Sequence, residues 1–518
     1  MRIPGPFAHF ILFLFIPITA IIFAQHKPRK AAFIVVIWGT MLLPEKAAFD
    51  PPILPAMDKH LIAPACAFVG LYMTAKSRFE KMRLLRGIQS FFFILVVGNF
   101  GTALTNPESF MWGGKEAWPG GPVYPIVIVP PLPQKEMIAM SITDFITFVA
   151  PFAVGQMLIQ SREEAILFLR GFVIGCLVYV PAMLWEGIMS PQLHRQLYGY
   201  HATGFAHNMR GDGYKPTVFM QSGLGVAMFE FIGLCGAMTM HRIKEKITPQ
   251  ISGAMATGII LFALSVSRNV AVVVYAAGVI PVFLFTSAKM MMRAAFVLAM
   301  IFLSFPLTRA QGWFPVDDII ELAESYSEDR AGSLAFRFEN EDILIEHTRE
   351  KPIWGWGSYG RNRKYDPDSG KDISVTDGEW AIHYSMRGGL GVIGWFWMAS
   401  FSILAAWRKL GKVRDPTDRI LMGAMALTAA INAADLLPNS SFTKLPFVYA
   451  GALAGLVAAI MRQQAEDDRG GPRRQPAGVP GAVGMPPPGG LGPPPGVAPP
   501  GMPPPGGLGP PPGPPYAR

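Results

Sequence analysis

Long apolar segments recur along the first 461 residues of this chain, and their length restricts the fold more than any other feature. Two examples are Ile166–Met189 and Phe442–Met461. A helix of about 20 apolar residues crosses a hydrocarbon core about 30 Å thick. Hydrophobic residues make up 51% of the chain and charged residues 16%, whereas soluble domains carry about 25% charged residues. We therefore predict an all-α, polytopic helical membrane protein.

The apolar segments divide the chain into four regions. We count 12 or 13 transmembrane helices, depending on whether a short second segment crosses the membrane. They occupy residues 1–308 and 383–462, separated by a long polar loop over residues 309–382 and followed by a tail over residues 463–518. The predicted spans are Phe7–Ala24, Ala31–Leu43, Leu61–Ala75, Ile88–Leu104, Met137–Ile159, Ile166–Met189, Thr217–Met240, Ile251–Val266, Val270–Phe285, Ala294–Leu307, His383–Trp407, Ile420–Leu437 and Phe442–Met461.

Basic residues cluster in several loops, which indicates how the helices are oriented. Three such runs are Lys76–Arg86, His241–Lys246 and Arg408–Arg414. Because basic loops are retained in the cytoplasm, we assign these loops to the cytoplasmic side. Alternation of the spans then puts the loop 309–382 outside the cytoplasm and the C-terminal tail inside. The formal net charge of +9 follows from such loops and does not indicate binding of nucleic acid.

The sequence contains no recognisable motif for a metal or a nucleotide. Cys66, Cys176 and Cys235 lie in apolar segments, which argues against a disulfide framework and a zinc site. There is no Walker loop, no dinucleotide fingerprint after a strand and no His-Glu-x-x-His motif. The glycine-rich segment Gly355–Gly360 lacks the lysine of a nucleotide loop, so we interpret it as a turn that brings backbone close to another element. We predict no cofactor and no metal.

The tail is rich in proline and glycine, and its segment 484–496 recurs as segment 501–513. Such repeats cannot bury a core, so we predict a disordered tail with polyproline II character. It could bind an aromatic groove of a protein partner, although a solubilising tail is the simpler alternative.

Three arginines are predicted on the external side, at the ends of spans or in the long loop: Arg210, Arg268 and Arg337. A single arginine in such a place is often an anchor at the membrane interface. Three of them favour an anion site, because one guanidinium group can bind two phosphate oxygens at once and stays charged. A lipid diphosphate in the outer leaflet is the anion that such a site would bind.

Several motifs within residues 200–400 resemble the O-antigen ligase and O-antigen polymerase superfamily of bacterial envelope glycosyltransferases. They are Ser267–Arg268, then Arg337 with Pro352–Gly357 (Pro-Ile-Trp-Gly-Trp-Gly), and finally Asp377–Trp380 (Asp-Gly-Glu-Trp) before Gly389–Gly394. Their order and spacing match the pattern of the family. The resemblance implies a protein of the bacterial inner membrane whose long loop lies in the periplasm.

The resemblance also implies an activity. It is the metal-independent transfer or polymerisation of a polyprenyl-diphosphate-linked glycan, with a sugar or a lipid-linked glycan as acceptor, in the biosynthesis of a surface polysaccharide or exopolysaccharide. Arg268 and Arg337, which match the motifs, would bind the diphosphate and stabilise the charge of the leaving group. Arg210 precedes the matching helix and is the third candidate.

Such a transfer needs a base that accepts the proton of a sugar hydroxyl. The candidates at the end of the long loop are Asp377, Glu379 and His383. The ligases carry a histidine near the end of the loop, where this chain has Asp377, with His383 six residues later. This difference favours a polymerase or a related exopolysaccharide enzyme over a ligase. His383 could also be a structural histidine at the start of a helix, and Asp435 could be a helix-terminal carboxylate.

The alternative function is a transporter or flippase of lipid-linked sugars. A transporter is expected to carry its charged groups near the middle of the bilayer, on broken helices in paired halves. Here the charged candidates cluster at helix ends and in one asymmetric loop, and we find no internal repeat outside the tail. This distribution favours the enzyme. A structural scaffold would explain the tail but not the loop.

Overall fold

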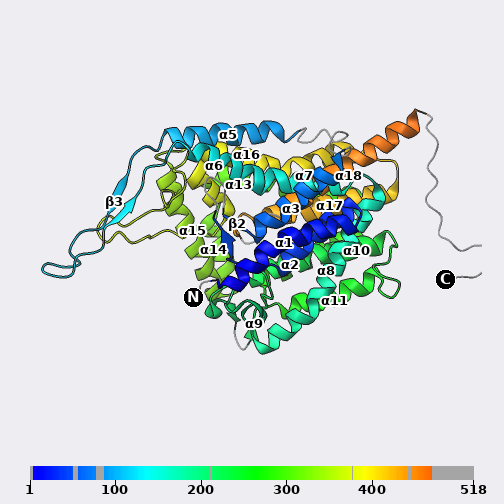
Figure 1. The fold of residues 1–518 in the computed structure, drawn as a ribbon, viewed down its shortest axis with the longest axis horizontal. Helices are drawn as coiled ribbons and strands as arrows, with labels where there is room; N and C mark the ends of the chain where they lie inside the picture. Colours follow the sequence, from blue (N-terminus) through cyan, green and yellow to red (C-terminus); the bar gives the residue numbers. More distant parts are fainter. Residues whose placement is uncertain are drawn as a thin grey trace, which may run out of the picture. The chain divides into compact units, whose positions relative to one another are not determined.

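The computed structural model describes residues 4–50, 56–76, 87–210, 213–375, 377–440 and 445–469, without the side chains of residues 206, 207, 210, 329 and 330. The basic run at 77–86 and the tail from residue 470 therefore lie outside the described residues. Long helices make up most of residues 4–469 (Figure 1), which confirms the predicted all-α class.

A helical segment lies at the position of every predicted span. The helices are α1 (Pro6–Gln25), α2 (Pro28–Leu42), α3 (Lys59–Thr74), α5 (Gln89–Leu104), α6 (Glu136–Asp144), η1 (Phe145–Val149), α7 (Ala150–Leu158), α8 (Arg162–Met189), α9 (Leu193–Tyr198), η2 (Phe205–Asn208), α10 (Gly223–Arg242), α11 (Gly253–Val266), α12 (Val270–Phe285), α13 (Ala288–Ala310), α14 (Val316–Glu324), α15 (Glu328–Thr348), α16 (Glu379–Leu410), α17 (Pro416–Asp435) and α18 (Leu445–Asp468). Within the described residues, seven helices are long and apolar enough to cross a membrane, and three shorter apolar helices accompany them. The chain is thus a multi-pass membrane protein, while the count of 12 or 13 crossings stays a prediction.

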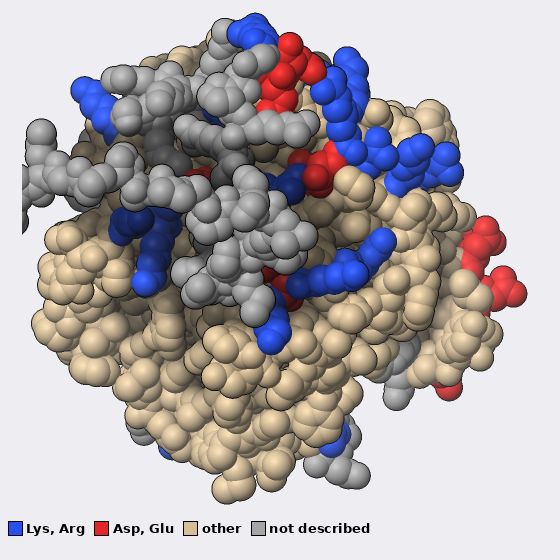
Figure 2. Space-filling model, turned by 90° about the vertical axis from the view of Figure 1, so that its right-hand side faces the viewer, with Lys and Arg blue, Asp and Glu red and all other residues tan. Residues whose placement is uncertain are grey.

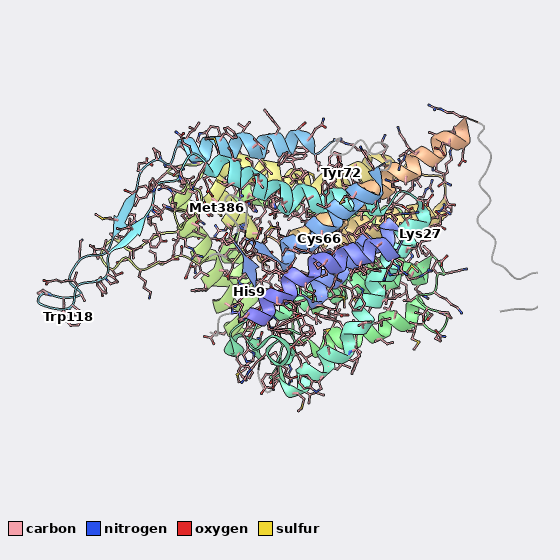
Figure 3. All side chains as sticks on the ribbon, viewed as in Figure 1. His9, Lys27, Cys66, Tyr72, Trp118 and Met386 are labelled. Carbon is pink, nitrogen blue, oxygen red and sulfur yellow. The ribbon has the colours of Figure 1, made fainter. Side chains whose placement is uncertain are left out.

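Short antiparallel ribbons interrupt the loops between the helices. Their strands are β1 (Ala48–Phe49), β2 (Met57–Asp58), β3 (Phe110–Trp112), β4 (Val127–Val129), β5 (Met209–Arg210) and β6 (Gly213–Tyr214). Strands β3 and β4, in the register Phe110↔Val129, form an arm that projects from the helices (Figure 1). Figure 3 shows Trp118 at the far end of this arm.

The described helices hold the core together through small residues as well as large ones. Helices α7 and α18 pack so closely that a Cβ on Gly155 would meet the Val448 carbonyl oxygen at 2.0 Å, and a Cβ on Gly451 would meet the Phe152 carbonyl oxygen at 1.9 Å. Small residues permit this approach, as is common between membrane helices. Helix α10 lies in the centre and packs against α8, α11, α12 and α17.

Ion pairs join helix ends in two groups, while the predicted alternation of the loops across the membrane stays a prediction. Arg162 pairs with Asp418, and Arg414 pairs with Asp468, among segments predicted to face the cytoplasm. Figure 2 shows the many basic side chains of this end of the helices. At the opposite end, Arg309 at the end of α13 pairs with the long loop.

The predicted boundaries need three corrections. Helix α10 begins at Gly223 rather than at Thr217, because the Thr217 and Val218 amides donate to the Glu186 carboxylate instead of to a helix. Helix α16 begins at Glu379, inside the predicted loop. Helix α18 continues to Asp468, six residues into the predicted tail, where Asp468 pairs with Arg414.

The long loop is also more ordered than the sequence indicated. The predicted polar loop 309–382 is not a plain connection, because it contains helices α14 and α15. Helix α14 has acidic residues in its first turn, Asp317 and Asp318, where they interact favourably with the helix dipole. Helix α15 includes Arg337 and packs against α14 and α16. The loop is therefore a small helical layer over one end of the membrane helices.

Candidate functional site

A cavity of about 240 Å³ lies where the long loop meets the ends of α13, α16 and α17. Its charged side chains are Arg337 and Glu341 from α15 and Asp377 from the segment before α16. Most of the remaining wall is apolar, formed by Ile301, Phe305, Phe314, Leu334, Phe338, Val375, Ala381, Ala434, Leu437 and Pro438. A few charged groups on an apolar wall suit an amphiphilic ligand.

Arg337 and Asp377 form an ion pair at this cavity. The Arg337 Nε atom lies 3.6 Å from the Asp377 Oδ2 atom, and the two side chains are 40% and 46% exposed. A pair this exposed is worth at most about 1 kcal/mol. An incoming anion can therefore compete with Asp377 for the guanidinium group.

Glu341 is a charged residue of the cavity that we did not single out from the sequence. Its Oε1 atom accepts from the Trp380 Nε1 atom at 3.0 Å, and its Oε2 atom accepts from the Arg309 Nε atom at 3.2 Å. Burial raises the pKa of Glu341 to about 7, against the opposing effects of Trp380 and Arg309. Glu341 follows Arg337 by four residues on α15, and this spacing places two side chains on one helix face. This four-residue spacing from Arg337 is the sequence signal that could have identified Glu341.

The raised pKa of Glu341 predicts that stability falls as the pH rises. Because the pKa exceeds its ordinary value of 4.5, the folded state binds the proton more tightly than the unfolded state does. The resulting stabilisation, up to about 3 kcal/mol, is complete below pH 4.5 and lost as the pH rises through about 7. Apparent melting temperatures of the protein in detergent, measured between pH 5 and 8, should show the loss. Glu341→Gln should flatten the profile relative to the wild type; parallel profiles would contradict this assignment.

A buried polar cluster lies beside the cavity, within reach of the charge of Arg337. The Tyr275 hydroxyl donates to the Asp435 Oδ1 atom at 3.2 Å, and the Asn439 Nδ2 atom donates to the same oxygen at 3.0 Å. The positive charge of Arg337 acts on both Tyr275 and Asp435. Asp435 is the last residue of α17 and is 3% exposed. Its hydrogen bonds agree with the interpretation of a helix-terminal carboxylate.

The other two predicted bases, Glu379 and His383, do not line this cavity. The Glu379 Oε1 atom and the His383 Nε2 atom lie 3.3 Å apart, one turn apart on α16, without the alignment of a hydrogen bond. The His383 ring is 3% exposed and stacks on Trp395 at 4.7 Å. His383 therefore faces the core between helices, whereas Asp377 lies at the cavity.

His383 adjoins a buried chain of polar groups between α16, α6 and α5. Its Nδ1 atom lies 3.3 Å from the Arg387 Nη1 atom. Arg387 in turn donates to the Asp144 Oδ1 atom at 2.6 Å, and Asn99 donates to the Asp144 Oδ2 atom at 2.7 Å. Each buried charge thus has a partner, which is what burial in a membrane requires.

The predicted arginines at Arg268 and Arg210 lie on neighbouring segments. Arg268 has a positive φ of 53° at the start of α12, and a Cβ on Gly213 would lie 2.4 Å from the Arg268 guanidinium carbon. Gly213 pairs with Arg210 across the ribbon β5–β6, so the Arg268 guanidinium packs on the ribbon that contains Arg210. The side chain of Arg210 lies outside the described residues. Whether Arg268 meets Arg337 at one anion stays a prediction.

Two glycine motifs of the sequence meet in the structure. Helix α16 is broken at Gly388, where φ is 62° and ψ is −161°. The segment Pro352–Gly357 packs against this break: the Trp356 amide donates to the Ser385 carbonyl oxygen at 2.9 Å, and the Gly389 amide donates to the Pro352 carbonyl oxygen at 2.8 Å. Figure 3 marks Met386 at the break, at the end of the helices from which the arm projects. The loop backbone thus replaces helix hydrogen bonds that the break removes.

These features define a multi-pass helical membrane protein with a charged cavity under an ordered loop, and a comparison with family models finds a match for part of the chain. Residues 253–386 match the O-antigen ligase family. The match extends from α11 to the break in α16 and includes Arg268, Arg337 and Asp377. The predicted resemblance is confirmed over this segment, and the match supports an O-antigen ligase-like role, that of a glycosyltransferase-like enzyme of polysaccharide assembly. A search of curated proteins finds no match.

Within the described residues, no group of three His, Cys, Asp or Glu side chains could hold a metal ion. Metal-independent transfer stays a prediction.

Proposed function

We propose that this protein transfers or polymerises a polyprenyl-diphosphate-linked glycan at the cavity between α13, α15, α16 and α17. The observation that carries the proposal is the pairing of Arg337 with Asp377 at a cavity whose wall is mostly apolar. A lipid diphosphate has the matching chemistry, because it joins an anion to a hydrocarbon chain. Both residues lie in the segment that matches the O-antigen ligase family.

In the proposed reaction, a hydroxyl of the acceptor glycan attacks the anomeric carbon of the donor sugar. The new glycosidic bond forms as the bond from the anomeric carbon to the diphosphate oxygen breaks. Asp377 accepts the proton of the hydroxyl, and polyprenyl diphosphate leaves with the bonding electron pair. Arg337 stabilises the charge that develops on the leaving group, which is commonly the largest contribution to catalysis in such reactions.

Arg268 is the second proposed contact to the diphosphate. It lies two residues before α12, and Tyr275 in the second turn of that helix donates to Asp435 in the polar cluster beside the first cavity. A donor that extends from the cavity along the start of α12 would contact both arginines. Arg210, on the ribbon under Arg268, is the third candidate.

We infer that the cavity faces the periplasm of a bacterium and that the protein lies in the inner membrane. Basic side chains gather at the opposite end of the helices (Figure 2), and basic loops are retained in the cytoplasm. The donor glycan would then meet the enzyme after it has crossed the membrane.

The glycan profile of the native host tests the proposal when Arg268→Ala or Arg337→Ala replaces the wild type. Removal of a charge-assisted contact to the leaving group should lower transfer roughly 10²- to 10³-fold. Polymerised or attached chains should disappear, and lipid-linked single units should accumulate on the periplasmic face. Arg349→Ala is the matched control, because this exposed arginine lies at the end of the same helix α15.

The location of the accumulated units distinguishes the two functions. Units that accumulate on the cytoplasmic face would support a transporter or flippase instead of a transferase. An unchanged profile, with the variants at normal levels in the membrane, would mean that these arginines are interface anchors.

A further inference from the structure

A second cavity, of about 90 Å³, lies between the base of the β3–β4 arm and the end of helix α15. Its walls include the aromatic side chains of Phe110 and Trp112 from the arm and of Trp356 and Tyr365 from the long loop. Phe110 and Trp112 lie nearly parallel, with ring centres 6.4 Å apart, and Phe110 meets Trp356 edge to face at 5.7 Å. The arm and the loop thus form one aromatic surface.

One buried polar atom of this cavity lacks a hydrogen bond in the described part of the chain, and two charged side chains of its lining lack an ion pair there. His347 is 8% exposed, and its Nε2 atom lies 3.0 Å from the Arg361 carbonyl oxygen. This contact leaves Nδ1 as an acceptor, and Nδ1 is buried without a hydrogen bond. Lys364 and Glu350 also line the cavity, and neither has an ion pair among the described residues. Buried polar atoms are normally satisfied, so the His347 Nδ1 atom points to a ligand, and the half-buried Lys364 and the exposed Glu350 stand beside it.

The remaining charges of the cavity are already neutralised. Arg361 donates to the carbonyl oxygens of Glu108 and Pro130 and lies 3.6 Å from the Glu108 carboxylate. Arg363 pairs with Asp372 at 2.6 Å. The opposite charges of Lys364 and Glu350 balance each other. The cavity therefore offers hydrogen-bond donors and acceptors without a net charge.

We propose that this cavity is a second glycan-binding subsite, which takes an uncharged sugar ring of the glycan substrate. The C–H face of a sugar ring packs on aromatic side chains, and its hydroxyl groups both donate and accept hydrogen bonds. His347 Nδ1 accepts from one hydroxyl, and Lys364 donates to another. The cavity is the smaller of the two, so we place one ring in it and the neighbouring sugars outside.

The position along α15 relates this subsite to the reaction. His347 lies ten residues after Arg337 on the same helix, which corresponds to about 15 Å. This separation spans a few sugar residues. A glycan that reacts at the first cavity would thus also be bound at a second point further along its chain. This inference therefore rests on the proposed function.

Binding of a soluble glycan tests the subsite without the reaction. The probe is the oligosaccharide that mild acid releases from the lipid-linked surface glycan of the native host, and it carries neither diphosphate nor lipid. Titration calorimetry measures its binding to the full-length protein in lipid nanodiscs. Trp112→Ala should weaken binding about tenfold, because it removes one stacking surface. Trp118→Ala is the matched control at the tip of the same arm (Figure 3) and should bind as the wild type does.

Lys364→Gln provides a second variant in case Trp112→Ala disturbs the arm. It replaces a side chain without an ion pair in the described residues, so the fold should persist while binding weakens several-fold. Equal binding by the wild type and both variants, or no binding by the wild type, would overturn the subsite. Preference for an acidic oligosaccharide over a neutral one would overturn the assignment of an uncharged ring.

Arg337→Ala separates the failure of this inference from that of the proposed function. It should leave binding of the soluble glycan unchanged, since the probe lacks the diphosphate. Loss of binding in Arg337→Ala alone would show that the glycan occupies only the first cavity. Binding at the second cavity together with an unchanged glycan profile in Arg337→Ala cells would instead reject the proposed diphosphate contact of Arg337 and leave the sugar subsite.

Discussion

Asp377→Asn should lower the rate of glycan transfer about 10²- to 10⁴-fold, the range over which a general base contributes. Among the three bases predicted from the sequence, Asp377 is the one that lines the cavity with Arg337. The asparagine keeps the shape of the side chain and an oxygen that faces the Arg337 guanidinium. It does not accept a proton at neutral pH, so binding of the donor should change little while kcat falls. Purified protein, lipid-linked donor and acceptor glycan, with kcat and KM measured separately, provide the test.

Two control variants show which base acts. Asp318→Asn changes an exposed aspartate of the same loop, in the first turn of α14 and outside both cavities, and should retain transfer. His383→Gln should mainly reduce stability, because His383 is stacked on Trp395 in the core. If a well-folded His383→Gln protein loses transfer and Asp377→Asn keeps it, the assignment of Asp377 as the base is rejected.

Gly388→Ala should destabilise the protein severely, by about 3–5 kcal/mol, since it combines a backbone conformation reserved for glycine with an overlap in the core. At Gly388 the backbone has φ 62° and ψ −161°. A Cβ there would lie 2.4 Å from the carbonyl group of Ile353. The loop segment would have to leave the break in α16, and its hydrogen bonds to Ser385 and Met386 would be lost. Lower membrane levels and a lower apparent melting temperature in detergent would report the effect.

Gly389→Ala is the matched control on the same helix. A Cβ at Gly389 would lie 3.4 Å from the Pro352 carbonyl oxygen, at the edge of ordinary contact, and the residue has no positive φ. Its cost should stay near or below 1 kcal/mol, the range of a tolerated small-residue change. Equal effects of the two substitutions would show that the break in α16 does not depend on the conformation of Gly388.

The membrane helices could be predicted from the sequence because the signal is local. An apolar run such as Val270–Phe285 is required by the bilayer whatever its neighbours are, and α12 has these bounds. The helices of the long loop gave a weaker signal. Helix α15 is polar along most of its length, so it shows no long apolar run. Its position depends on packing against α14 and α16.

The candidate site could be predicted only in part, because some of its contacts join segments that are distant in the sequence. Arg337 and Asp377 could be selected by residue type and motif, and the structure brings them together. The separation of Asp377 from His383 depends on where α16 begins: Asp377 precedes the helix, while His383 lies on a buried face of its first turns. The partner of the motif Pro352–Gly357 is a helix break some 30 residues away in sequence, and no local pattern indicates that contact.

The ion pair between Arg337 and Asp377 has a consequence for the order of the catalytic cycle. In the protein without a donor, the Arg337 guanidinium group, which would bind the anion, is paired with the Asp377 carboxylate, which would accept the proton. The arrival of the diphosphate at Arg337 would release Asp377, so the acceptor hydroxyl, or water, meets an active base only after the donor is bound. A weak, exposed pair would thereby limit wasteful hydrolysis of an energy-rich lipid intermediate, and Asp377→Asn would lose hydrolysis of the donor together with transfer.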